Sequence, residues 1–171
     1  KVTLVTTTSL PVTTGIDVVH VATAAEMEHA VLSRADDADI VVMAAAVADF
    51  RPVASEAQKL KKADGVPAVT LEPTTDILAA LGERRRPGPT LVGFAAATND
   101  VRVNAPAKLT RKGIDLIVAN DVAAPGVGFE HDTNAVVILG ADGSIEEIPL
   151  TDKRAVARAI LNQVSTTRSL S

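Results

Sequence analysis

The chain contains no cysteine. That absence excludes disulfides, thiolate zinc sites and a cysteine nucleophile, and it favours the cytosol, so we expect a cytoplasmic protein. Tyrosine and tryptophan are also absent, and aromatic residues make up only 2% of the chain. No apolar run approaches the ~18 residues of a membrane span, and no signal peptide is visible. We therefore expect no membrane partner.

An excess of positive charge is missing as well, because the net charge is −4. A nucleic-acid partner is therefore not expected. The cations are instead local, and the clearest clusters are 59–62, 84–86 and 108–112. Local cations on an acidic protein suit a small anionic ligand better than a polymer.

The 171 residues, 47% of them apolar, fit a single domain with a core of small aliphatic side chains. Strand and helix patterns alternate along the chain. Strands are expected at 1–7, 17–21, 39–46, 66–71, 90–96, 114–119, 134–140 and 144–150, and helices at 23–35, 77–85, 100–112 and 151–164. The pattern predicts an α/β fold, with an open, mostly parallel Rossmann-like sheet, helices on both faces and a late antiparallel hairpin. The run Ile40–Val42 is typical of a strand buried on both faces.

In such sheets ligands bind beyond the carboxyl ends of the strands. Ala45 and Ala46 carry almost no side-chain bulk, so a flat ligand could lie against the backbone there. Asp49 is the first carboxylate after that strand; it fits either a ligand contact or a turn. Phe94 fits either base stacking or core packing. Asn120 follows a later strand and is expected to bind substrate.

Three further segments could meet an anion, and each has an ordinary alternative. Thr75, Asp76, Ile77 and Leu78 open a helix, whose free N–H groups favour phosphate but could simply be capped. Lys108 and Lys112 are spaced i, i+4 and share a helical face, which suits an anion or plain solvation. The basic cluster 59–62 (KLKK) either contacts a phosphate or lies in a solvated loop.

The three histidines are scattered and make no metal-ligand spacing, so no protein metal site is predicted. No G-x-S-x-G, P-loop or zincin motif is present, which argues against hydrolases and P-loop NTPases.

Six blocks in the same order resemble the phosphopantothenate–cysteine ligase family. They are AAAVADFRP (44–52), KLKK (59–62), DIL (76–78), VGFAAAT (92–98), KLTRKGIDLIVANDV (108–122) and GFEHDTNAV (128–136). In bacteria this ligase is usually the C-terminal half of a bifunctional coenzyme A biosynthesis protein. The resemblance implies an N-terminal decarboxylase half that carries FMN, which is absent from this chain.

The resemblance also implies the reaction. CTP and 4′-phosphopantothenate give an acyl-cytidylate and pyrophosphate, and cysteine then displaces CMP. Lys59 resembles the family's catalytic mobile-loop lysine, which contacts the nucleotide and turns over the acyl-cytidylate. The other matched nucleotide contacts are Ala45, Ala46, Asp49, Thr75, Asp76, Ile77, Leu78, Phe94, Lys108 and Lys112. Mg²⁺ would bridge phosphates with few protein ligands, and a homodimer is implied.

This sequence departs from the family pattern at three places. The family's opening glycine-rich turn and Asn-x-Ser-Ser-Gly stretch are missing, so we expect the ligase domain over 1–171 to lack its first strand and that turn. Thr74–Thr75 stands for Asn-Pro, and Ala97 stands for glutamate. Two alternatives remain: a non-catalytic nucleotide-binding or dimerisation fragment, and a nicotinamide-dependent oxidoreductase, which the missing tyrosine and glycine fingerprint disfavour. The sequence alone does not separate CTP from ATP.

Overall fold

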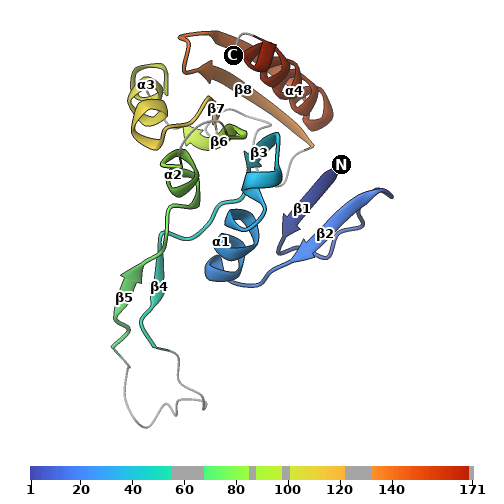
Figure 1. Ribbon diagram of the computed structural model, residues 1–171. Helices are drawn as coiled ribbons and strands as arrows, with labels where there is room; N and C mark the ends of the chain where they lie inside the picture. Colours follow the sequence, from blue (N-terminus) through green and yellow to red (C-terminus); the bar gives the residue numbers. More distant parts are fainter. Residues whose placement is uncertain (55–67, 85–87, 98–100, 122–131, 170–171) are drawn as a thin grey trace. The chain divides into compact units, whose positions relative to one another are not determined.

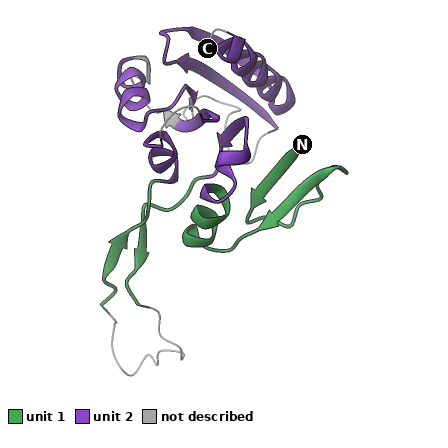
Figure 2. Cartoon of the chain, in the orientation of Figure 1, with its two compact units in different colours: residues 1–31, 46–76 green, residues 32–45, 77–171 purple. Residues whose placement is uncertain are grey.

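A computed structural model describes residues 1–54, 68–84, 88–97, 101–121 and 132–169. The chain divides into two compact units, shown in green and purple in Figure 2. One unit comprises Lys1–Val31 and Ala46–Asp76, and the other comprises Leu32–Ala45 and Ile77–Ser171. The single ligase domain expected over 1–171 stays a prediction.

The larger unit is built on a five-stranded sheet of order β3-β6-β7-β8-β9 (Figure 1). β3, β6 and β7 run parallel, whereas β8 and β9 are antiparallel neighbours joined by the expected turn. The predicted α/β fold with a mostly parallel sheet and a late hairpin is thus confirmed. The strands are β3 (Ile40–Met43), β6 (Thr90–Ala97), β7 (Leu116–Asp121), β8 (Thr133–Gly140) and β9 (Ile145–Asp152).

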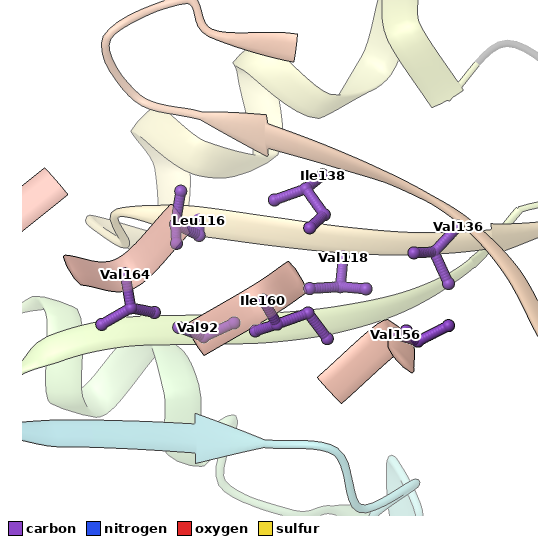
Figure 3. Packing of buried hydrophobic residues seen from close by; sticks show 8 residues of the cluster. All are labelled: Val92, Leu116, Val118, Val136, Ile138, Val156, Ile160 and Val164. Carbon is purple, nitrogen blue, oxygen red and sulfur yellow. The ribbon is translucent and has the colours of Figure 1, made fainter. Parts of the chain in front are cut away.

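The main core lies between this sheet and α4 (Lys153–Ser169), and it consists of small aliphatic side chains, as the composition predicted (Figure 3). Alternation along a strand sends Val92 and Val118 to the face that α4 covers. Arg168, near the end of α4, donates hydrogen bonds to the carbonyl and carboxylate of Asp39, just before β3, at 2.5 and 3.1 Å. The cluster is Val92, Leu116, Val118, Val136, Ile138, Val156, Ile160 and Val164.

The opposite face of the sheet carries α2 (Ile77–Gly82) and α3 (Val101–Lys112). Gly93 of β6 lies directly beneath Leu78 of α2, since a Cβ added at Gly93 would be 2.4 Å from Cδ2 of Leu78. The two helices meet backbone to backbone at their C-terminal ends. A Cβ on Gly82 would lie 1.8 Å from the carbonyl oxygen of Lys112, and Gly113 has a φ of +61°. Glycine is therefore required at this contact.

The smaller unit begins with a parallel pair, β1 (Val2–Thr6) and β2 (Ile16–His20). The capping box predicted for the next helix is confirmed. The N–H of Glu26 donates to the Thr23 hydroxyl at 3.1 Å, and the Glu26 carboxylate accepts from the N–H groups of Thr23 and Ala22. The helix α1 (Ala24–Leu32) ends earlier than expected, and a 3₁₀ turn, η1 (Ala35–Asp37), follows it.

An antiparallel ribbon of β4 (Phe50–Pro52) and β5 (Leu71–Pro73) completes this unit. β4 was not predicted. Arg51 and Glu72 face each other across the ribbon and form an ion pair at 2.7 Å. The cross-strand pairs Phe50–Pro73 and Pro52–Leu71 share the opposite face, so that face is entirely apolar.

The expectation that the Ile40–Val42 run is buried on both faces is wrong. Among the described residues β3 pairs with β6 alone, so it is an edge strand. Ile40 is 36% exposed and Val42 is 44% exposed. A continuous apolar run indicates a strand, but it does not indicate whether that strand lies in the interior or at the edge of the sheet.

Candidate functional site

The carboxyl ends of β3, β6 and β7 lie at one edge of the sheet. Met43, the last residue of β3, is level with Gly93 and Ile117 in the parallel register, and β6 and β7 stay paired beyond that level as far as Ala97 and Asp121. Ala45 follows β3, Phe94 follows Gly93, and Asn120 lies near the end of β7. Three residues predicted for ligand binding are thus brought to one edge.

Phe94 and Asn120 also share a face of the sheet. Phe94 is opposite Val118, and Asn120 lies two residues further along β7, so alternation puts both on the α4 face. Phe94 is 36% exposed and is not part of the buried cluster. An accessible ring beyond the level at which β3 ends fits stacking on a base better than core packing.

Ile77 and Leu78 begin α2 and are buried. The two residues are 3% and 9% exposed, and Leu78 covers Gly93. The family resemblance assigned them to a segment that holds the nucleotide through its main chain. The role itself stays a prediction.

The base of the ribbon brings together Asp49 and Thr75–Asp76, which are far apart in sequence. The N–H of Thr74 donates to the carbonyl of Asp49 at 2.9 Å, and the Thr74 hydroxyl donates to the carbonyl of Ala48 at 2.5 Å. Asp49, Thr75 and Asp76 are all exposed. Ala46, which is also exposed, precedes this segment in the same unit.

The lysines of α3 are not brought to the carboxyl edge. β6 and β7 are parallel, so α3 must run back from the carboxyl edge to the amino edge, and Lys112 is its last residue. Lys108 lies one turn earlier, about 6 Å along the helix. Lys108 is exposed and Lys112 is half-buried. Lys59 lies outside the described residues, so its role stays a prediction.

The described residues contain no group of three or more His, Cys, Asp or Glu side chains that could hold a metal ion. No helix in the described part is long and apolar enough to cross a membrane. At the amino edge of the parallel strands, hydrogen bonds from the hydroxyl and N–H of Ser144 lower the pKa of Asp142 in the β8–β9 turn. Thr74 was predicted only as part of a helix cap. Its link to Ala48 spans 26 residues, which no local pattern reveals.

The sheet order and the aligned strand ends define an open α/β protein of Rossmann type. A family model described as "DNA/pantothenate metabolism flavoprotein C-terminal domain" matches residues 1–167. The chain therefore belongs to this family, and the resemblance to the phosphopantothenate–cysteine ligase domain is confirmed.

Two relatives show how the match extends. A Bacillus subtilis (strain 168) protein named "Coenzyme A biosynthesis bifunctional protein CoaBC" is 48% identical over 145 residues, which cover 85% of this chain and 36% of that protein. A protein of an unknown prokaryote named "Cysteine/Cysteine sulfinic acid decarboxylase" is 40% identical over 156 residues, covering 91% and 44%. The chain thus spans less than half the length of these curated relatives.

Solved structures agree with the family assignment. The crystal structure of the C-terminal domain of a CoaBC protein superposes with a TM-score of 0.80 at 37% identity, covering 100% of this chain and 78% of that one. A Cab2 mutant in complex with phosphopantothenate-cysteine gives a TM-score of 0.64 at 16% identity, covering 90% and 54%, and at that identity it supports the fold alone.

Proposed function

We propose that this chain is the ligase domain of a bifunctional coenzyme A biosynthesis protein. It would join 4′-phosphopantothenate to cysteine at the expense of CTP. The observation that carries the proposal is the family match over 1–167, which includes every residue assigned to the site. The proposal extends to a cytoplasmic location and to an N-terminal, FMN-containing decarboxylase half outside this chain.

In the proposed reaction a carboxylate oxygen of 4′-phosphopantothenate attacks the α-phosphorus of CTP, and pyrophosphate leaves. The amine of cysteine then attacks the acyl carbon of the resulting acyl-cytidylate, loses a proton and displaces CMP. The first step brings anions together, so cations placed to meet that charge are the main help a protein can give. Lys59 is the first cation proposed for this role. Lys108 and Lys112 are proposed for it on the family resemblance alone, since α3 carries Lys112 to the amino edge of the sheet.

The aligned strand ends would hold the nucleotide. Phe94 would stack on the base, and the small Ala45 and Ala46 would let it approach the backbone. Asp49 would accept hydrogen bonds from its donor groups, while the main chain of Thr75–Leu78 would bind it through N–H groups. Asn120, which shares the sheet face of Phe94, would contact the phosphopantothenate. Mg²⁺ would bind chiefly to phosphate oxygens, since the described residues form no acidic cluster.

Thermal unfolding with nucleotides tests this proposal directly. CTP with Mg²⁺ at 100 times its dissociation constant should stabilise the protein by about 2.7 kcal/mol, which raises Tm by roughly 5–10 °C for a chain of this size. ATP should give a smaller shift, because the family's bacterial members are expected to prefer CTP. A protein that no nucleotide stabilises would contradict the proposal. Stabilisation by CTP without any phosphopantothenoylcysteine, measured by mass spectrometry in the complete natural protein, would favour the non-catalytic fragment instead.

We also propose that another parallel strand pairs with the free edge of β3 in the complete protein. β3 has the continuous apolar sequence of an interior strand, yet Ile40 and Val42 are 36% and 44% exposed at that edge. A neighbouring strand and the helices of a wider sheet would cover them. We propose this position for the first strand that the family resemblance implies.

The proposed homodimer has a suitable surface in the apolar face of the ribbon. Phe50 is 61% exposed and Leu71 is 55% exposed, although a two-stranded ribbon needs its apolar face covered to be stable. Pro52 and Pro73 remove N–H donors from the ribbon's two outer edges, because their cross-strand pairs are the non-hydrogen-bonded ones. A second copy would therefore pack face to face. The absence of charge on that face suits self-association.

Leu71→Glu should weaken this dimer at least tenfold, because packing two such faces would bury the new carboxylate. Sedimentation of the wild type and the variant over a range of concentrations measures the change. Leu150→Glu is the matched control, since Leu150 is 53% exposed on β9, and it should leave association unchanged. Equal dissociation constants for Leu71→Glu and the wild type would show that the ribbon face is not the interface.

A further inference from the structure

Thr74 ties together the two chain segments that leave the base of the ribbon. Its N–H donates to the carbonyl of Asp49 at 2.9 Å. Its hydroxyl donates to the carbonyl of Ala48 at 2.5 Å. A single residue thus holds two consecutive carbonyls of the partner segment.

The hydrogen bond from the Thr74 hydroxyl lies at the end of the ribbon's series of cross-strand bonds, where the two chain segments separate. Below it, the ribbon is held by the Arg51–Glu72 ion pair and by the bond from the N–H of Val53 to the carbonyl of Thr70 at 3.0 Å. The bond between Thr74 and Asp49 is the last backbone bond on that side, and the hydroxyl adds one contact beyond it. Without this contact the end of a two-stranded ribbon is free to fray.

The segments that separate at this point carry proposed nucleotide contacts. Asp49 is next to Ala48 on one of them, and Thr75–Asp76 directly follows Thr74 on the other. We propose, on the basis of the ligase function above, that Thr74 is a positioning residue: its hydroxyl fixes the Asp49 carboxylate relative to the main chain of Thr75–Asp76 before the nucleotide arrives. Groups held in their bound arrangement in advance lose less entropy on binding.

Thr74→Val tests this role, because valine keeps the shape of threonine and the backbone N–H bond but lacks the hydroxyl. In the complete natural protein, we expect the dissociation constant of CTP, measured by calorimetry at 25 °C, to rise about fivefold, as for the loss of one net hydrogen bond. KM for CTP should rise by a similar factor while kcat changes less than twofold. Thr74→Ser, which keeps the hydroxyl, should restore both values.

Thr70→Val is the matched control. It makes the same chemical change four residues earlier on the same side of the ribbon, at an exposed position whose backbone carbonyl makes the ladder bond. It should bind CTP like the wild type. A purely structural role for Thr74 would lower Tm but leave the dissociation constant at 25 °C unchanged, and that result would overturn the inference. So would equal losses in Thr74→Val and Thr70→Val.

The failure of this inference is distinguishable from the failure of the proposed function. If the wild type binds CTP and Thr74→Val binds it equally well, the positioning role is wrong and the ligase proposal stands. If the wild type binds no nucleotide, the ligase proposal falls, and with it the role assigned to Thr74.

Discussion

Gly82→Ala is expected to destabilise the protein by about 3 kcal/mol, at the upper end of the cost of overpacking. The added Cβ would lie 1.8 Å from the carbonyl oxygen of Lys112 and 2.8 Å from its carbonyl carbon. Both atoms belong to the backbone, so no side-chain rotation can relieve the clash, and the ends of α2 and α3 must move apart. Denaturant unfolding measures the loss, and Tm should fall by roughly 6–12 °C.

Gly88→Ala is the control for this prediction. No atom of the described residues lies within 4 Å of a Cβ built at Gly88, and its φ is not in the left-handed region. The same chemical change should therefore shift stability by less than about 1 kcal/mol, in either direction. If Gly82→Ala were as stable as Gly88→Ala, the close approach of the two helix ends would not exist in solution.

The contact between the ends of α2 and α3 at Gly82 also affects the proposed nucleotide site. α2 begins with Ile77 and Leu78, and α3 carries Lys108 and Lys112, so proposed nucleotide contacts lie on both helices. Their C-terminal ends are joined at Gly82 and Gly113, where a Cβ on Gly113 would lie 2.9 Å from the Gly82 carbonyl oxygen. Separating these ends moves one set of contacts relative to the other.

Local patterns predicted much of the fold. The capping box at Thr23 and Glu26, the apolar strands at the centre of the larger sheet and the turn at 141–143 all depend on residues close in sequence. The ribbon was missed because its strands are three residues long and each ends in proline, a residue that usually interrupts a strand. The two segments form strands because they pair with each other, and no local sequence pattern indicates that pairing.

The site was predictable to the extent that it follows the strands. Ala45, Phe94 and Asn120 could be assigned to one edge because parallel strands end together. The i, i+4 spacing of Lys108 and Lys112 indicated a shared helical face, but not that the helix carries Lys112 to the amino edge. Thr74 was overlooked because its hydrogen-bond partner, Ala48, becomes a neighbour only once the ribbon has formed.

Lys59→Gln is expected to reduce the formation of phosphopantothenoylcysteine by about 10²–10³-fold, the usual cost of removing one group that stabilises charge in a transition state. Glutamine keeps a long polar side chain but lacks the charge. The role of Lys59 comes from its match to the family's KLKK block, since the residue lies outside the described part of the structure. The resemblance implies a loop position for Lys59, so we expect the substitution to change stability by less than about 0.5 kcal/mol and Tm to change little.

The step that fails should be the second one. If Lys59 acts on the acyl-cytidylate, the variant should still release pyrophosphate in its first turnover, while the amide product and CMP appear slowly. Rapid-quench measurement of pyrophosphate and CMP in the complete natural protein separates the two steps. Lys153→Gln, at an exposed lysine at the start of α4, is the matched control and should behave as the wild type. Normal CMP release by Lys59→Gln would show that the catalytic cation is another residue, and the remaining cations of the proposal, Lys108 and Lys112, would then be tested by the same pair of measurements.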